Sequence, residues 1–210
     1  MRILFYGDSN TWGYDAQSGL RYTERFTALI QKACPEDEII EEGLCGRTIC
    51  HEDPYSFEQR NGTKTVSMVI KTHVPLDLIV IMLGTNDAKR VYGTNAASSI
   101  EKGMDMLLHE VMDPENYKHA SKKPKILVLC PPKMHPGFRD REFTWANFSE
   151  EGYRIIENMK EPLKRVCEKW KVDFYDLEDV VAGQFDALHL DLQGHQKIAE
   201  KLIPKLGEYR

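Results

Sequence analysis

Short apolar runs recur along the chain, separated by longer stretches in which apolar residues return every three or four positions. The runs at 77–83 and 125–130 are apolar almost throughout rather than alternating, which is typical of parallel strands buried on both faces. Similar runs predict three more strands, so the expected strands lie at 2–6, 38–41, 77–83, 125–130 and 172–177.

The intervening stretches predict amphipathic helices. In 21–34, for example, Phe26, Leu29, Ile30 and Ala33 fall on one face of a helix. Strands that alternate with helices need crossover connections, which produce a parallel sheet. The sequence therefore predicts an α/β fold, a three-layer α/β/α sandwich with a five-stranded parallel sheet. The other expected helices cover 61–73, 96–112, 148–170 and 191–206.

Length and composition fit one domain over residues 1–210, because 41% of the residues are hydrophobic and no repeat or linker interrupts the chain. The net charge of −5, without a stripe of Lys and Arg, argues against a nucleic-acid partner. No run approaches the roughly 18 apolar residues of a membrane span, and no signal-peptide pattern precedes the first strand. We therefore expect a cytoplasmic protein without a membrane partner.

The five cysteines are odd in number, and no pair has the spacing of a zinc knuckle. Free thiols in a reducing compartment are the expected state. The sequence predicts no metal site.

Four polar clusters each follow a predicted strand, at the edge where open α/β sheets bind their ligands. In "GDSNTWG", after the first strand, Gly7 lets the chain turn sharply and leaves Ser9 at the carboxyl end of the strand. An ordinary turn or capping serine explains this stretch equally well. In "EEGLCGRT", after the second strand, Gly46 is able to present a backbone N–H to a ligand, although a simple turn is favoured when the stretch is taken alone.

The other two clusters supply an amide and an acid–base pair. In "MLGTNDAK", Asn86 offers a neutral donor for an oxyanion, while Asp87 suits a helix cap, a role that would also explain Asn86. In "FDALHLDLQGHQ", one helical turn separates Asp186 from His189, so the carboxylate can orient the imidazole and leave its other nitrogen free as a base. Taken alone, a capping Asp186 and a structural His189 are more common. His195 is expected at the surface or behind the site.

The joint occurrence of these clusters is more informative than any one of them. A serine, a backbone donor, an amide donor and an Asp/His pair are the parts that acyl transfer needs: nucleophile, oxyanion hole, base and orienting acid. Because all of them fall on one edge of one sheet, the sequence predicts a site for acyl transfer.

With the blocks "GDSNTWG", "GLCGRT", "GTND" and "DALH" in this order, the chain resembles the SGNH hydrolases, also called GDSL-type esterases and lipases. The Ser, Gly, Asn and His of the family name fall on Ser9, Gly46, Asn86 and His189, and Asp186 matches the acid of the Asp-x-x-His block. The resemblance implies a flavodoxin-like SGNH hydrolase fold over nearly the whole chain. It also implies a catalytic triad of Ser9, His189 and Asp186 and an oxyanion hole of Ser9, Gly46 and Asn86.

The blocks look especially like those of the branch that contains small bacterial aryl esterases and acyltransferases. Some members of that branch assemble into compact oligomers, which leaves a homo-oligomer open. The resemblance implies a small-molecule ester as substrate and requires no metal or organic cofactor. Asn10 stands where the family name has Leu, and Cys45 where Ser or Ala is frequent. Together with Asp8 and Trp12, these residues are the expected substrate contacts.

Short-chain acyl esters are the expected substrates, because the chain has no long apolar lid segment. Acyltransferase, carbohydrate deacetylase and thioesterase activities use the same parts and stay open. Outside the enzymes, the alternative is an α/β binding module with a degenerate site. A flavodoxin-like mononucleotide binder fits less well, since Asp8 would face the charge of the phosphate.

Overall fold

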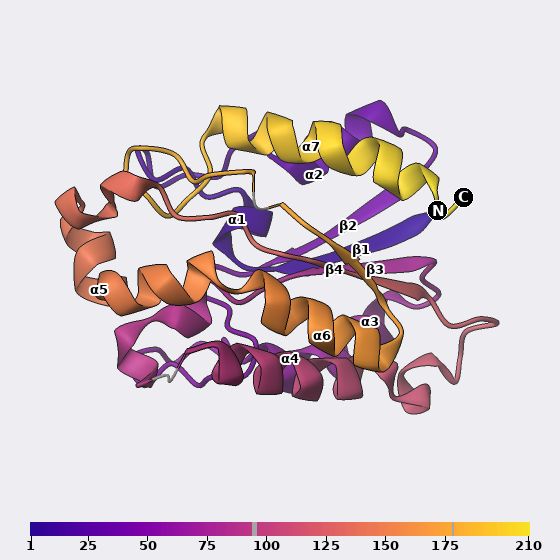
Figure 1. Ribbon diagram of the computed structural model, residues 1–210. Coiled ribbons are helices and arrows are strands. Elements are labelled where there is room, and N and C mark those ends of the chain that lie inside the picture. The colour runs from indigo at the N-terminus through magenta and orange to yellow at the C-terminus, as the bar shows by residue number, and fades with distance from the viewer. Residues whose placement is uncertain (94–95, 178) are drawn as a thin grey trace.

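The computed structural model, which describes residues 1–93, 96–177 and 179–210, shows a five-stranded sheet between two layers of helices (Figure 1). Every neighbouring pair of strands is parallel, and the order is β2-β1-β3-β4-β5. The predicted three-layer α/β architecture is therefore confirmed. The strands are β1 (Arg2–Gly7), β2 (Glu38–Gly43), β3 (Leu78–Met82), β4 (Lys125–Leu129) and β5 (Asp173–Tyr175).

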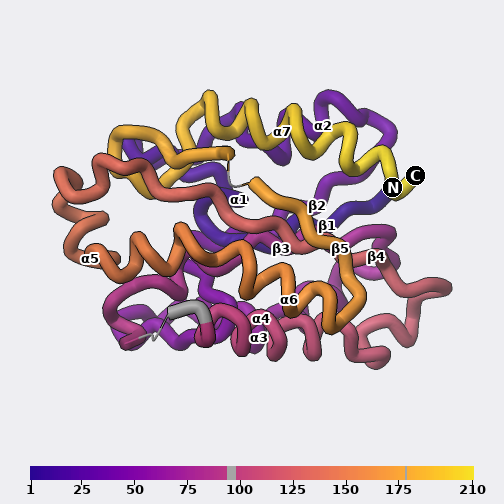
Figure 2. The backbone as a smooth tube through the Cα atoms, viewed as in Figure 1, coloured from indigo at the N-terminus to yellow at the C-terminus, as the bar shows by residue number. Residues whose placement is uncertain are grey.

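The helices divide between the two faces of the sheet. One face is covered by α2 (Phe26–Ala33) and α7 (Leu192–Gly207), which lie along the top of Figure 1. The short helix α1 (Ser9–Trp12) stands at the carboxyl end of β1, and Figure 2 shows both chain termini at the opposite end of the molecule. Within the described residues, no helix is long and apolar enough to cross a membrane. The other face is covered by α3 (Gly62–His73), α4 (Ala96–Met112), α5 (Glu142–Glu157) and α6 (Lys160–Trp170).

Alternate residues of the strands pack on opposite faces of the sheet, as the pleat requires. In β1, Leu4 and Tyr6 belong to the core beneath α3 to α6, whereas Ile3 and Phe5 belong to the core beneath α2 and α7. All five residues of β3 are buried. Burial on both faces explains the unbroken apolar runs in the sequence.

Two predicted helices have different boundaries in the structure. Residues 21–25 precede α2 instead of belonging to it, and the Tyr22 N–H donates to the Gly13 carbonyl at 2.7 Å. The single helix predicted over 148–170 is two helices, α5 and α6, which meet at Asn158. Pro162 explains the break, because proline removes a hydrogen bond to the carbonyl four residues earlier and its ring clashes with that carbonyl.

His195 lies in neither of its expected places but in the core between α7 and α2. It is fully buried, and its Nδ1 accepts the Phe26 N–H at 3.3 Å. The ring also packs against the rings of Tyr22 and Phe26, with centroids 5.4 and 6.0 Å away. Burial lowers the pKa of His195 from 6.5 to about 4, because the charged imidazolium would lose its hydration.

We predict that His195 makes the protein less stable in acid. The unfolded chain takes up a proton here below about pH 6.5, but the folded protein does so only near pH 4, so stability falls as pH falls through that window. From about pH 7 to about pH 5, this residue should remove about 2 kcal/mol from the free energy of unfolding. His195→Asn keeps an acceptor for the Phe26 N–H but does not titrate. Between the same two pH values, the free energy of unfolding of this variant should therefore fall by about 2 kcal/mol less than that of wild type.

Urea unfolding at the two pH values measures the difference between wild type and His195→Asn. His119→Asn is the matched control, because it makes the same substitution at an exposed position. Equal losses for wild type and His195→Asn would contradict the prediction.

Candidate active site

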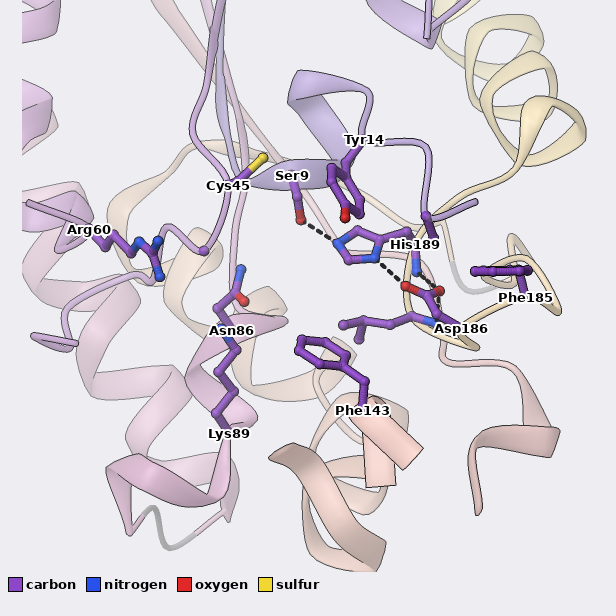
Figure 3. Close-up of a pocket in the computed structure, with 13 residues that line it drawn as sticks. Ser9, Tyr14, Cys45, Arg60, Asn86, Lys89, Phe143, Phe185, Asp186 and His189 are labelled. Carbon is purple, nitrogen blue, oxygen red and sulfur yellow. Dashed lines mark hydrogen bonds and ion pairs between the residues drawn. The ribbon is translucent and has the colours of Figure 1, made fainter. Parts of the chain in front are cut away.

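The predicted site residues gather at the carboxyl edge of the sheet, where the strand order reverses. Because β1 lies between β2 and β3, the segments after these three strands surround one crevice. A cavity of about 420 Å³ opens at this point (Figure 3). Its lining includes Ser9, Gly46, Asn86, Asp186 and His189, one or more residues from each of the four sequence blocks.

Ser9, His189 and Asp186 form a continuous hydrogen-bonded chain (Figure 3). The Nε2 of His189 lies 2.9 Å from Ser9 Oγ, and its Nδ1 lies 2.5 Å from Asp186 Oδ2. Ser9 is 7% exposed, and the side chains of His189 and Asp186 are 12% and 15% exposed. An imidazole placed in this way is able to take the proton of the hydroxyl while the carboxylate holds the ring.

The bonds around Asp186 keep its carboxylate ionised. Its Oδ1 accepts the N–H groups of Leu188 and His189 at 3.0 and 2.9 Å. Burial favours the neutral acid, but the bonds from His189 and the nearby N–H groups outweigh burial and hold the pKa of Asp186 below its ordinary value. An ionised carboxylate at this position can stabilise a positively charged imidazole ring.

The position of Ser9 follows from the way α1 begins. Asp8 caps the helix, since its Oδ1 accepts the Asn10 N–H at 2.9 Å. A Cβ on Gly7 would lie 2.0 Å from Thr11 Oγ1, so only glycine lets α1 pack this closely against the end of β1. The sequence attributed Gly7 to a sharp turn, but the structural reason is this close approach.

Asp186 and His189 reach the serine because the segment after β5 runs back across the sheet edge. β5 is three strands away from β1, a distance of about 14 Å at the usual strand spacing. The Leu190 N–H donates to Asn10 Oδ1 at 2.9 Å, and Thr144 Oγ1 donates to the Asp186 carbonyl at 2.5 Å.

Residues 186–189 form a tight turn, with Ala187 at a φ of 63°, instead of the helical turn expected from the spacing.

Gly46 and Asn86 reach the cavity from the ends of β2 and β3. The Asn86 side-chain NH₂ donates one hydrogen to the Arg47 carbonyl at 3.1 Å, which leaves its second hydrogen available. Gly46 has a φ of 81°, a conformation that favours glycine, and a Cβ there would lie 2.9 Å from Arg60 Nη1, while no hydrogen bond of its backbone N–H is found among the described residues. Both groups are therefore donors that a negatively charged oxygen is able to use.

Arg47 is a buried residue to which the sequence analysis assigned no role. Its guanidinium donates to the Gly7 carbonyl at 2.9 Å and to the Glu42 carbonyl, and it lies 4.2 Å from the centroid of the Tyr6 ring. Burial lowers the pKa of the guanidinium. Arg47 thus ties the ends of β1 and β2 together while its own carbonyl holds Asn86. Nothing in "GLCGRT" distinguishes it from a surface arginine.

Among the four residues expected to contact substrate, only Cys45 lines the cavity. Burial raises the pKa of its thiol. Asp8 is buried beneath α1, where burial raises its pKa to about 6. Asn10 is also buried and holds the returning segment. Trp12 lies beneath the Arg21 guanidinium, whose carbon is 5.4 Å from the ring centroid. Asp8, Asn10 and Trp12 therefore contact other parts of the protein and do not line the cavity as expected.

The cavity has two chemically different sides, which the sequence did not reveal. Tyr14, Phe143 and Phe185 form an apolar side around His189, and the Tyr14 ring centroid lies 4.7 Å from that of His189. Arg60 and Lys89 reach the opposite side, next to Asn86 (Figure 3). Lys89 stands in the quoted block "MLGTNDAK", and Tyr14 directly follows "GDSNTWG", so the sequence held a signal for these two residues. Phe143 and Phe185 come from segments with no recognisable motif.

Cys50, His51 and Asp87 place potential metal-ligating atoms within 4.8 Å of one another. Asp87, however, accepts the Ile49 N–H at 2.8 Å and the Cys50 N–H at 3.4 Å, which ties the segment after β2 to that after β3. Burial raises the pKa of Asp87 to about 7. We assign this carboxylate a structural role in joining the two segments, in place of the helix cap expected from the sequence. None of the five cysteines, which all lie in the described part of the chain, forms a disulfide bond.

Comparisons with known proteins agree with this arrangement. The sequence model of the GDSL-like lipase/acylhydrolase family matches residues 5–197. A carbohydrate acetylesterase family member from Sinorhizobium meliloti is 30% identical, with a TM-score of 0.89 over 99% of this chain and 98% of that chain. An aryl esterase from M. smegmatis is 29% identical, with a TM-score of 0.86 over 100% of this chain and 99% of that chain. Among curated proteins, no sequence shows a significant match.

The fold and these similarities define a carboxylic ester hydrolase. The chain belongs to the GDSL-like lipase/acylhydrolase family, and the resemblance to the SGNH hydrolases is confirmed.

We predict that Thr144 holds the turn that carries Asp186. Thr144 is fully buried, and Thr144→Val keeps its shape but removes the hydroxyl that binds the Asp186 carbonyl. The unpaired carbonyl should lower the free energy of unfolding by about 1–3 kcal/mol and slow ester hydrolysis. Thr144→Ser keeps the hydroxyl and serves as the matched variant. Urea unfolding and the kcat for p-nitrophenyl acetate measure both effects, and a Val variant equal to the Ser variant would rule the role out.

Proposed function

We propose that the protein hydrolyses short-chain acyl esters through an acyl-enzyme intermediate on Ser9. The observation that carries this proposal is the unbroken chain of hydrogen bonds from Ser9 through His189 to Asp186 in the cavity wall. A serine hydroxyl is a weak nucleophile until a base takes its proton. The 2.9 Å contact between Ser9 Oγ and His189 Nε2 supplies such a base.

In the first half of the reaction, His189 takes the hydroxyl proton while Ser9 Oγ attacks the ester carbonyl carbon. Asp186 stabilises the imidazolium that forms and keeps the ring in the orientation needed. His189 Nε2 then gives the proton to the leaving alcohol as the carbon–oxygen bond breaks. In the second half, water attacks the acyl group with the same base, and Ser9 is released.

The charge on the carbonyl oxygen needs donors placed in advance. The proposed oxyanion hole consists of the backbone N–H groups of Ser9 and Gly46 and the second amide hydrogen of Asn86. As the first residue of α1, Ser9 has a backbone N–H with no acceptor within the helix. Each donor of this kind contributes roughly 3 kcal/mol to the transition state.

The dimensions of the cavity support short acyl groups. Its volume of about 420 Å³ lies at the lower end of the range for small-molecule sites. Phe143 and Phe185 are 59% and 56% exposed at its rim, so each can contact an ester that enters. Acetyl esters of carbohydrates or aryl alcohols are the class suggested by the two similar structures.

Acyl transfer is the second candidate function. The same acyl-enzyme reacts with an alcohol when the alcohol reaches Ser9 in place of water. The apolar side formed by Tyr14, Phe143 and Phe185 favours this outcome, because it offers an alcohol a contact surface that water does not use. A panel of alcohols added to the hydrolysis assay measures the ratio of ester product to free acid.

We predict that Ser9→Ala lowers the kcat for p-nitrophenyl acetate by at least about 10³-fold, because the nucleophile is lost. The variant should also no longer be labelled by a fluorophosphonate probe, which reacts only with an activated serine. Ser18→Ala changes an exposed serine and is the control. Full activity in Ser9→Ala would show that the nucleophile is a different residue.

Asn86→Ala should lower kcat by about 10²–10³-fold and change KM little, because the amide acts on charge that exists only in the transition state. Steady-state kinetics with p-nitrophenyl acetate separates the two constants, and urea unfolding shows whether the lost bond to the Arg47 carbonyl has also weakened the fold. An unchanged kcat in a folded variant would remove Asn86 from the oxyanion hole.

A further inference from the structure

Lys89 brings a positive charge to the cavity, and no described residue pairs with it directly. The residue comes three positions after Asn86, and its half-buried side chain lines the cavity beside that amide (Figure 3). Within residues 1–93, 96–177 and 179–210, the Lys89 ammonium has no hydrogen bond and no ion pair.

The other cation of the cavity is already balanced. Arg60 binds Asp53 through Nη1 and Glu58 through Nη2, each at 2.8 Å. Asp53, Asp8 and Asp87 attract Lys89 only across a distance. Asp53 is already the ion-pair partner of Arg60, and Asp8 and Asp87 are buried and bonded to backbone N–H groups. Among the described residues, Lys89 is therefore the cation of this cavity that has no carboxylate in contact.

An ammonium in this position is poorly solvated. Burial lowers the pKa of Lys89, which means that the charged form has lost part of its hydration without gaining a carboxylate in contact. Buried and partly buried charges are normally paired. A negatively charged group on a ligand would supply the missing partner.

The proposed chemistry assigns this group to one side of the ester. The leaving oxygen must face His189, because Nε2 returns the proton to it. The carbonyl oxygen must face Gly46 and Asn86. Lys89 lies beyond Asn86 and across the cavity from His189 (Figure 3). A charge that reaches Lys89 is therefore carried by the acyl chain and not by the alcohol.

We propose that Lys89 forms an anion subsite, so that the enzyme prefers short acyl chains that end in a carboxylate, such as the succinyl half-ester. This inference rests on the proposed function, because it takes Ser9 as the nucleophile and His189 as the group facing the alcohol. Lys89 binds a part of the substrate that does not react, so its contribution is present before and during the chemical step and appears mainly in KM.

The test uses two esters that differ in charge and little in shape. Monomethyl succinate carries a carboxylate at the end of its acyl chain, and methyl levulinate carries a neutral methyl ketone there. Methanol release at neutral pH gives kcat and KM for both esters. Lys89→Met removes the charge and keeps the length of the side chain. Lys32→Met, at an exposed position on α2, is the matched control.

Wild type should prefer monomethyl succinate over methyl levulinate in kcat/KM. Lys89→Met should lower kcat/KM for the charged ester about tenfold more than for the neutral ester, a difference of about 1.4 kcal/mol, with most of the change in KM. Lys89→Glu should lower kcat/KM for the charged ester further than Lys89→Met does. Lys32→Met should retain the wild-type constants for both.

Equal losses for the two esters in Lys89→Met, or no preference in wild type, would overturn the anion subsite. A second pair, p-acetoxybenzoate and the neutral p-acetoxyacetophenone, places the charge on the alcohol. A Lys89-dependent preference found only in that pair would overturn the assignment to the acyl chain.

The proposed function has its own readout in the same assay. If Ser9→Ala abolishes turnover of methyl levulinate but wild type shows no charge preference, the subsite is wrong and the esterase mechanism stands. If Ser9→Ala hydrolyses methyl levulinate and p-nitrophenyl acetate as fast as wild type, the proposed function itself is wrong.

Discussion

The contact between Ser9 Oγ and His189 Nε2 is the interaction on which the rest of the site depends. It joins residues 180 positions apart in the chain at a distance of 2.9 Å. No local turn or helix is able to bring such residues together. The parallel sheet does so by aligning the carboxyl ends of its strands at one edge, and the segment after β5 completes the contact by returning across that edge. The close packing of α1 at Gly7 then sets where the hydroxyl stands.

Buried polar groups hold this edge in a fixed arrangement. Arg47 joins the ends of β1 and β2 and positions Asn86, while Asp87 joins the two loops that follow β2 and β3. Asn10 and Thr144 hold the returning segment from opposite directions. Each of these bonds pairs a side chain with a backbone group beside the site. Losing one therefore both weakens the fold and displaces a residue of the site.

The sequence predicts the sheet well because strands buried on both faces leave unbroken apolar runs, and it predicts the site because the four blocks each follow a strand. It does not predict which side chains share the cavity. Lys89 follows a recognisable block, but Phe143 enters from the first turn of α5 and Phe185 from the segment after β5, and the positions of both depend on the whole fold. The break at Asn158 was missed because a proline in the first turn of a helix is tolerated. The buried position of His195 depends on the rings of Tyr22 and Phe26, which lie far from it in the sequence, so the periodicity around His195 does not indicate it.

The long separation of Ser9 from His189 also orders events during synthesis of the chain. At about 5–20 residues per second, the ribosome needs about ten to forty seconds to add the residues between them. During that time the serine is already present in the growing chain, but on the proposed mechanism its hydroxyl has no base to accept its proton. The nascent chain would therefore carry an unreactive serine until His189 has been added. On the same mechanism, the serine becomes reactive only when the segment after β5 folds back across the sheet edge and brings His189 to it.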